Sequence, residues 1–228
     1  MGLTEKERLL VSHFAQYISD HKKEFMAKVL SQRTRHVTVV LEDIYQSQNA
    51  SAAIRTCECM GLQDVHIVEN TAKYQFNTRV LKGSDKWMDL LRYRTKGINN
   101  TAPCFQHLQN QGYTIYTADP GNGGVSIHEL NPVNKTAIVF GNELRGASQF
   151  ALDHCHQKVN IPMFGFTESL NISVSVAICL NSIITRLHSE KWEYGLTLEE
   201  QESLTLQWYR KVVRKSDLME REFLRAIE

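Results

Sequence analysis

The fold is most constrained by a strand, a helix and a second strand that follow one another within about 30 residues. Residues 36–41 (HVTVVL) are rich in β-branched side chains and predict the first strand. Ser47 is suited to cap a helix and Gly61 to end it. Residues 64–68 (DVHIV) predict the second strand. Because strands joined through a helix pair in parallel with a right-handed crossover, the sequence predicts an α/β fold with a parallel sheet.

The rest of the chain extends this pattern into one domain with helical ends. Further strands are predicted at 88–93, 113–118, 136–140 and 159–161, and further helices at 102–111 and 147–154. Apolar residues recur at helical spacing over 3–33 and again beyond residue 196. We therefore expect an α/β domain at 36–190, with helical extensions at 1–35 and 191–228.

Composition narrows the class of protein. The 228 residues are 42% hydrophobic and 22% charged, with a formal net charge of +1, which is typical of a globular protein. No apolar run approaches the ~20 residues of a membrane span, and the charged N-terminus does not resemble a signal peptide. Five cysteines without CxxC spacing argue against a disulfide framework or a zinc site. We expect a cytoplasmic protein without a membrane or a metal.

Three loops rich in small and polar residues follow strand ends, at 49–55, 141–146 and 162–171. Ligands in open α/β sheets bind beyond the carboxyl ends of the strands, so these loops predict a single site. Glycines in the second and third loops allow the backbone to approach a ligand or to adopt a positive φ. Glu143 can accept hydrogen bonds, and the Arg55 guanidinium can grip a phosphate.

The third loop leads into an unusually apolar helix. Pro162 has no amide donor and interrupts regular structure, and Ser169 is a favourable N-cap. Residues 172–187 then predict a helix that is apolar on most sides. On its own this stretch indicates a strand, a loop and a capped core helix. The breadth of the apolar surface also indicates burial by a second subunit.

Together the three loops resemble the three motifs of the SPOUT methyltransferases, specifically the TrmH branch of RNA ribose 2′-O-methyltransferases. The matching segments are NASAAIRTCECMG at 49–61, IVFGNELRGAS at 138–148 and IPMFGFTESLNISVSVA at 161–177. The GSDKW segment at 83–87 is similar to the same subgroup. Order, spacing and residue types agree from about residue 36 to 190.

This resemblance implies a parallel sheet with helices on both faces and a C-terminal trefoil knot. It also implies a homodimer with its active site at the subunit interface, and S-adenosylmethionine as the methyl donor held in the knot. Carried over residue by residue, donor binding is expected at Thr117, Ala118, Gly141, Asn142, Glu143, Gly146, Ile161, Ser169 and Leu170.

The catalytic residues implied by the resemblance come from all three motifs. Asn49 and Arg55 match the first motif, Glu143 the second, and Ser169 and Asn171 the third. The reaction needs the ribose 2′-hydroxyl aligned with the methyl carbon for in-line displacement. Because free arginine is a very poor base, we expect Arg55 to grip the RNA phosphate and stabilise the developing alkoxide. A general-base role for Arg55 stays open.

Basic segments at 22–35, 73–96 and 210–215 predict an RNA-binding surface, since cations interleaved with aromatics suit phosphates and stacked bases. The expected contacts are Lys28, Arg33, Arg35, Arg79, Lys82, Lys86, Arg210 and Lys211. The short N-terminal extension leaves no room for the RNA-binding domain of some ribosomal RNA enzymes. Short helical extensions at both ends resemble those of the TrmH branch instead, and this resemblance implies methylation of guanosine 18 in the tRNA D-loop. The alternatives are ribosomal RNA or the tRNA wobble nucleotide as substrate, or an inactive RNA-binding dimer.

Overall fold

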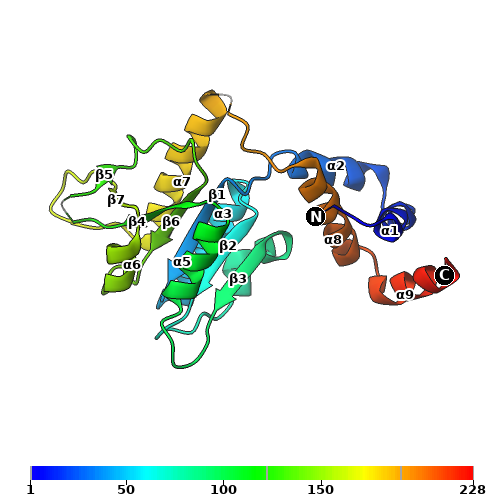
Figure 1. Cartoon of the computed structure of the whole chain (residues 1–228), viewed down its shortest axis with the longest axis horizontal. Helices are drawn as coiled ribbons and strands as arrows, with labels where there is room; N and C mark the ends of the chain where they lie inside the picture. Colours follow the sequence, from blue (N-terminus) through cyan, green and yellow to red (C-terminus); the bar gives the residue numbers. More distant parts are fainter. Residues whose placement is uncertain (1, 122, 191, 228) are drawn as a thin grey trace. The chain divides into compact units, whose positions relative to one another are not determined.

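Residues Thr34–Tyr194 form an α/β unit, and Met1–Arg33 with Gly195–Glu228 form a second, helical unit (Figure 1). The computed structural model describes residues 2–121, 123–190 and 192–227. The two predicted extensions thus belong to one compact unit, although they come from opposite ends of the chain.

The α/β unit is built on a seven-stranded sheet in which all neighbouring strands are parallel. Its spatial order is β3-β2-β1-β6-β4-β7-β5. The strands are β1 (Val37–Glu42), β2 (Asp64–Val68), β3 (Asp89–Tyr93), β4 (Thr114–Ala118), β5 (Val125–Ser126), β6 (Thr136–Phe140) and β7 (Gln157–Asn160). The predicted parallel sheet is confirmed, whereas the two-residue strand β5 was not predicted.

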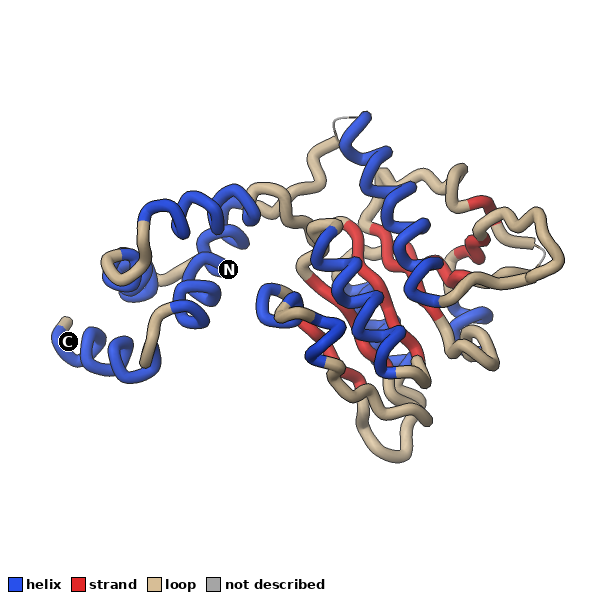
Figure 2. Tube along the Cα trace, turned by 180° about the vertical axis from the view of Figure 1, so that it is seen from behind, coloured by secondary structure: helices blue, strands red, loops and turns tan. Residues whose placement is uncertain are grey.

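Helices cover both faces of the sheet, as predicted (Figures 1 and 2). Helices α3 (Ser47–Cys59) and α7 (Ile172–Ser189) pack on one face, and α5 (Thr101–Asn110) and α6 (Gln149–His154) on the other. Along β6 the side chains alternate between the two apolar clusters. Because both faces are buried, the central strands β1 and β6 are apolar almost throughout rather than alternating with polar residues.

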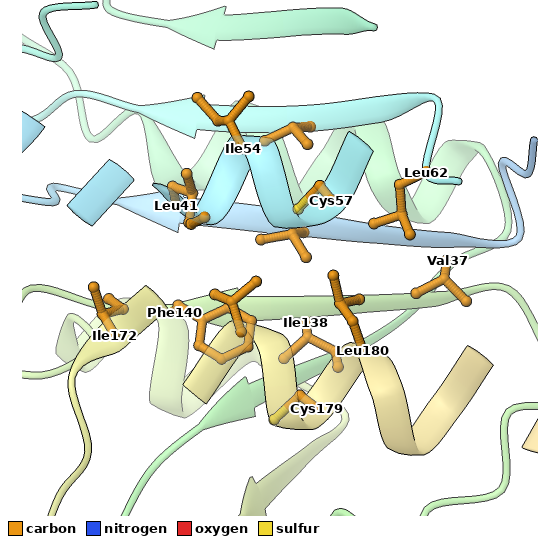
Figure 3. Packing of buried hydrophobic residues seen from close by; sticks show 14 of the residues in the cluster. Val37, Leu41, Ile54, Cys57, Leu62, Ile138, Phe140, Ile172, Cys179 and Leu180 are labelled. Carbon is orange, nitrogen blue, oxygen red and sulfur yellow. The ribbon is translucent and has the colours of Figure 1, made fainter. Parts of the chain in front are cut away.

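The larger apolar cluster joins the sheet to α3 and α7 (Figure 3). Ile54 and Cys57 of α3 pack with Leu41 and Ile138 of the sheet, all buried, and Leu180 of α7 belongs to the same cluster. This packing fixes the start of α3 and the start of α7 beside the carboxyl ends of the strands. The loops that carry the predicted site residues are thereby held on a rigid frame.

The start of α7 differs from the prediction. Ser169 was expected to cap this helix, but Asn171 is the N-cap, and its Oδ1 accepts a hydrogen bond from the Ser173 amide at 2.9 Å. Asparagine and serine are equally good N-caps, so residue type alone does not separate them. The side-chain amide of Asn171 is held from the other side by Asn49, which favours Asn171 as the cap.

Helix α7 is long and apolar enough, by length and composition alone, to cross a membrane, with a mean hydropathy of 1.3 over 18 residues. Its buried residues include Val176, Leu180 and Ile183, which belong to the large apolar cluster. These contacts identify α7 as a core helix of the α/β unit.

The segment between β2 and β3 overlaps the predicted basic segment at 73–96 and includes two short helices. It contains α4 (Thr78–Leu81) and a 3-10 helix, η1 (Ser84–Trp87). Tyr74 is buried, and its hydroxyl lies 3.0 Å from the Ser51 hydroxyl on α3. The segment is therefore anchored to the core through an aromatic side chain.

The helical unit comprises α1 (Glu5–Ala15), α2 (Asp20–Leu30), α8 (Leu198–Val212) and α9 (Ser216–Ala226). Helices α1 and α8 each begin with a capping box, formed by Thr4 with Glu7 and by Thr197 with Glu200. Fully buried side chains, Trp208 among them, form the interior of this unit.

Candidate active site

The three predicted loops meet at one cavity of about 510 Å³ at the carboxyl ends of β4, β6 and β7. Of the sequence-predicted site residues, it is lined by Asn49, Ala118, Gly141, Asn142, Glu143, Gly146, Ile161, Ser169, Leu170 and Asn171. Segments more than 100 residues apart in the chain thus converge on one wall, as their position after strand ends predicts.

A hydrogen-bond chain through Asn49 ties the three loops together. Asn49 is 9% exposed, and its Nδ2 donates to Oε1 of Glu143 at 3.0 Å. Its Oδ1 accepts from Nδ2 of Asn171 at 3.1 Å. The same Nδ2 also donates to Gln46 Oε1 at 3.1 Å. A single side-chain amide therefore fixes the relative positions of the first, second and third motifs.

Glu143 binds the backbone just before the start of α3. Its carboxylate accepts hydrogen bonds from the amides of Tyr45 at 2.8 Å and Gln46 at 3.2 Å, in addition to Asn49. Burial raises the pKa of the Glu143 carboxyl, but these hydrogen bonds outweigh it and hold the pKa below its usual range. The group is therefore a carboxylate at neutral pH, and it acts here as an anchor for backbone rather than as a proton donor.

Gly141 is required because backbone approaches it closely. A Cβ at this position would lie 2.1 Å from the Ala147 nitrogen and 2.3 Å from the Gly146 carbonyl carbon. The loop beyond it is closed by two hydrogen bonds of 2.8 Å between the backbones of Asn142 and Gly146. This compact loop leaves the Gly141 backbone open to the cavity.

Thr117 does not line the cavity, although donor binding was predicted there. It is fully buried in β4, and its hydroxyl donates to the Ala151 carbonyl oxygen at 3.2 Å. The cavity wall begins one residue later, at Ala118. Because successive strand residues face opposite sides of the sheet, a shift of one residue moves a side chain from the cavity to the core.

Arg55 is exposed on α3 and is not among the residues that line the cavity. Asn49 lies at the start of the same helix and reaches the cavity, whereas Arg55 is nearly two turns further on. A single chain therefore does not assemble the full set of predicted catalytic side chains around this cavity.

A second and larger hollow, of about 910 Å³, runs along the outer faces of α3 and α7. Its walls are Ala52 and Thr56 of α3, the C-cap residue Met60, and residues of α7 such as Val174 and Ile178. Small and apolar side chains of the two helices line much of it, together with polar side chains and with His128 from the loop after β5. It resembles an uncovered packing surface more than a small-molecule site. Arg55 lies between Ala52 and Thr56 in sequence.

The smaller cavity suits a nucleoside donor. Its volume lies within the roughly 300–1,000 Å³ of small-molecule sites. Its lining combines apolar residues such as Phe140, Ile161 and Leu170 with polar ones such as Asn142 and Ser169. The open backbone at Gly141 can meet a ligand without side-chain interference. Within residues 2–121, 123–190 and 192–227, no group of three His, Cys, Asp or Glu side chains is arranged to hold a metal.

Two of the predicted RNA contacts have partners within the fold. Arg33 is 1% exposed, and its Cζ lies 5.5 Å from the Trp208 ring centroid, so its prediction as a surface contact was wrong. Arg35 is held at the base of the sheet by Asp64 and Asp89, at 3.0 and 2.7 Å. Sequence reasoning missed these partners because they are distant in the chain.

The other predicted RNA contacts lie at the surface. Arg210 is half-buried and paired with Glu220 at 2.7 Å. The exposed cations are Lys28, Arg79, Lys82, Lys86 and Lys211. Contact between these residues and RNA stays a prediction.

The structure adds cavity residues that were not among the predicted site residues, among them Gln46, Asp119 and Glu168. Gln46 could have been found from spacing, because it precedes Asn49 by three residues and therefore lies on the same side of the first turn of α3. Glu168 lies within the third motif segment, and Asp119 directly follows a predicted strand, so their positions also carried a signal.

Comparisons with known proteins agree with this geometry. Residues 36–181 match the model of the SpoU rRNA Methylase family. A tRNA (guanosine(18)-2′-O)-methyltransferase of Borreliella burgdorferi is 41% identical over 206 residues, which cover 90% of this chain and 92% of the relative. The crystal structure of the A. aeolicus TrmH/SpoU tRNA modifying enzyme has a TM-score of 0.74 at 24% identity, covering 86% of this chain and 98% of that chain. The SpoU methyltransferase AviRb from Streptomyces viridochromogenes, in complex with the cofactor AdoMet, has a TM-score of 0.59 at 18% identity, covering 71% of this chain and 62% of that chain.

Proposed function

Because this chain belongs to the SpoU rRNA methylase family, we propose that it methylates the ribose 2′-oxygen of guanosine 18 in tRNA. The relative from Borreliella burgdorferi bears this activity in its name and covers nearly the whole chain. One structural observation carries the proposal: the hydrogen-bond chain through Asn49 assembles all three motifs around one cavity.

The cavity provides the surfaces that a methyl-transfer reaction requires. S-adenosylmethionine, when bound there, supplies an electrophilic methyl group. Gly141, Ile161 and Leu170 bind it through backbone and apolar contacts, and Asn142 and Ser169 orient it through polar ones. Holding donor and acceptor in line converts a bimolecular reaction into an effectively unimolecular one, which contributes up to roughly 7–11 kcal/mol in the best cases.

Arg55 stabilises the oxygen that attacks. The 2′-oxygen would form its bond to the methyl carbon as the sulfur–carbon bond of the donor breaks, with the thioether as the leaving group. The hydroxyl proton passes to solvent water, and a guanidinium beside the oxygen favours the developing negative charge. The same guanidinium can form two hydrogen bonds to the neighbouring phosphate and thereby fix the position of the ribose. Since Arg55 does not line the cavity of its own chain, it performs this role in the cavity of a second copy.

A homodimer supplies that second copy. The outer face of α7 keeps Val174 at 44% exposure and, with α3, forms the hollow of about 910 Å³. An apolar helix face of this kind is ordinarily covered by a partner. Arg55 lies on α3 beside this surface, so pairing of two chains across it would bring each Arg55 toward the other chain's cavity.

Mixing two inactive variants tests the shared site. Arg55→Ala keeps an intact cavity, and Ser169→Trp fills the cavity but keeps Arg55. If Arg55 acts across the dimer, unfolding and refolding them together should restore about a quarter of wild-type activity, because half of the dimers then hold one complete site. A mixture that stays inactive, although sedimentation shows dimers, would contradict the shared site.

The substrate is tested by mapping ribose methylation on bulk tRNA after incubation with the protein and S-adenosylmethionine. We expect modification at guanosine 18, abolished by Arg55→Ala while calorimetry shows donor binding largely retained. Loss of donor binding in Arg55→Ala would show that Arg55 holds the donor instead. Modification only at the wobble nucleotide, or only in ribosomal RNA, would contradict the substrate. Absence of both transfer and donor binding would favour an inactive RNA-binding dimer.

We also infer a trefoil knot. Strand β7 lies between β4 and β5 in the sheet, although β5 follows β4 directly in the chain. The connection from β4 to β5 therefore crosses β7. We infer that the chain that continues from β7 into α7 threads through this connection, which would create the knot. An experimental structure in which residues 161–171 run outside the connection would contradict this inference.

The proposed substrate also indicates where the protein works. A tRNA-modifying enzyme meets its substrate in the cytoplasm, and we propose that location. Cys57, Cys59, Cys104, Cys155 and Cys179 are all free thiols, which fits a reducing compartment. Recovery of the protein in a membrane or exported fraction would contradict it.

A further inference from the structure

A third cavity, of about 350 Å³, lies directly beside the proposed donor cavity. The loop that follows Gly141 separates the two, and Asn142 and Gly146 line both. Glu143 and Leu144 line the donor cavity, whereas Arg145 lines the third. One short loop therefore serves two cavities, with a carboxylate on the donor side and a guanidinium on the other.

The third cavity contains a carboxylate that is held rigidly in place. Asp43 has φ 51°, and its Oδ1 accepts three backbone amides, from Asn70 at 2.7 Å, Thr71 at 2.8 Å and Ala72 at 3.1 Å. Among the described residues no donor reaches its Oδ2. Aspartate enters the left-handed region more readily than most other non-glycine residues, and here the three amides hold its side chain in one orientation. The structure thus fixes one free acceptor oxygen.

Donors stand around the same cavity. The Arg145 side chain is exposed and forms no hydrogen bond or ion pair with the described part of the chain. The Oδ1 of Asn99 accepts the Thr101 amide at 3.0 Å, which leaves its Nδ2 to donate. Ile98, 52% exposed, adds an apolar surface. The cavity therefore offers one fixed acceptor, two sets of donors and a surface for a flat ring.

Glu42 completes the floor without taking part in recognition. This carboxylate is 2% exposed, and it accepts hydrogen bonds from the Ser148 amide at 2.8 Å, the Ser148 hydroxyl at 2.7 Å and the Thr101 hydroxyl. Its bonds are internal, so it supports the loop that carries Ser148. Asp43, the next residue in the sequence, has a carboxylate whose Oδ2 can still accept a hydrogen bond from a ligand.

We propose that this cavity binds the guanine base of the nucleotide to be methylated, an inference that rests on the proposed function. Guanine presents N–H donors on its Watson–Crick edge, which the Asp43 carboxylate can accept, and the O6 and N7 acceptors, which an arginine binds bidentately. Adenine places an acceptor where guanine carries N1–H, so the carboxylate repels it. The two cavities share Asn142 and Gly146, so a base bound in the third cavity can place its own ribose toward the donor cavity.

The test compares methylation of tRNA transcripts that carry guanosine or adenosine at position 18. Asp43→Asn retains Oδ1 for the three amides and tolerates the left-handed backbone, but it turns the free acceptor into a donor. We expect kcat/KM on the guanosine transcript to fall roughly 10- to 100-fold and the guanosine-to-adenosine ratio to fall at least about tenfold. Donor binding in calorimetry should stay within about twofold of wild type, because Asp43 does not line the donor cavity.

The matched control is Asp153→Asn, which makes the same chemical change on the exposed side of α6 and should leave both rates unchanged.

A second variant, Arg145→Gln, tests the same cavity independently, so the inference stays testable even where Asp43→Asn does not fold. The wild-type enzyme should lose activity when position 18 is 7-deazaguanosine, which lacks N7, and Arg145→Gln should no longer distinguish it from guanosine.

The outcomes distinguish a failure of the proposed function from a failure of the guanine site alone. Wild-type protein that leaves guanosine 18 unmethylated overturns the proposed function, and this inference with it. Wild-type protein that methylates guanosine 18, with an Asp43→Asn variant that keeps the full guanosine-to-adenosine ratio, overturns the guanine site alone. An Arg145→Gln variant that still discriminates against 7-deazaguanosine overturns the role of Arg145 in that site.

Discussion

The side chain of Asn171 donates a hydrogen bond to the side chain of Asn49 at 3.1 Å, across 122 positions of sequence. Asn49 in turn donates a hydrogen bond to Glu143. The Glu143 carboxylate also accepts hydrogen bonds from the two backbone amides that directly precede α3. Each of the two asparagines uses both ends of its amide, as donor and as acceptor. The loops around the donor cavity are therefore positioned by neutral amides that bridge between a carboxylate and a helix N-terminus.

Asn49→Asp should destabilise this arrangement more than Asn49→Ala does. The aspartate keeps an acceptor for Asn171 but places a second carboxylate about 3 Å from Glu143, where like charges repel. We expect the free energy of unfolding to fall by about 1–3 kcal/mol at neutral pH, and S-adenosylmethionine affinity to fall as well. Urea unfolding and calorimetric titration measure the two effects.

The control for this substitution is Asn134→Asp, which adds the same charge at an exposed position outside the cavity. It should leave both stability and donor binding unchanged within error. Recovery of Asn49→Asp stability at mildly acidic pH, where one of the paired carboxyls takes up a proton, would support the electrostatic cause. An Asn49→Asp variant as stable as wild type at neutral pH would show that the hydrogen-bond chain does not hold the loops.

Glu143→Gln should reveal a pH-dependent contribution to stability. The pKa of Glu143 is lower in the folded protein than in the unfolded chain. Its contribution is therefore fully present above the unfolded pKa and is lost as pH falls through the folded pKa. We expect the stability difference between wild type and Glu143→Gln to be largest near neutral pH and to vanish in acid. Equal stability of wild type and Glu143→Gln at neutral pH would contradict this contribution.

Arg79→Ala and Arg35→Ala should have opposite effects on RNA binding and stability. Arg79 is exposed on α4, and its loss should weaken tRNA binding and reduce the salt slope by about one, without a change in stability. Arg35 bridges Asp64 and Asp89, so its loss should lower the free energy of unfolding by about 1–3 kcal/mol and leave the salt slope intact. Salt-dependent binding and urea unfolding distinguish these outcomes. Equal salt slopes for Arg79→Ala and wild type would remove Arg79 from the RNA surface.

Local signals predicted the frame of the α/β unit well. β-Branched runs such as TAIVF at 136–140 became central strands, because parallel strands buried on both faces need continuous apolar sequence. The convergence of the three motif loops also followed from local signals, since each loop comes after a strand end. Neither inference required knowledge of side-chain partners.

The roles of individual side chains could not be predicted from local sequence, because they depend on which residues contact them in the fold. Arg33 and Arg35 stand together in a basic run, yet one is buried over Trp208 and the other is bound by two aspartates. The two glycines of the second loop have different roles, because Gly146 has a positive φ of 70° whereas Gly141 is needed for the close approach of Ala147. The sequence does not show which glycine has which role.

Gly141→Ala should impair donor binding through the backbone. The added Cβ would lie 2.1 Å from the Ala147 nitrogen and 2.2 Å from its Cα, so the loop that ends at Gly146 has to move. Because these are backbone atoms, rotation of a side chain cannot relieve the overlap. We expect a fall in the free energy of unfolding of about 1–3 kcal/mol, as for overpacked cores, and at least about a tenfold loss of S-adenosylmethionine affinity. Gly165→Ala is the matched control, since its Cβ meets nothing closer than 4.0 Å. Equal donor affinities for the two variants would show that the close approach at Gly141 does not shape the cavity.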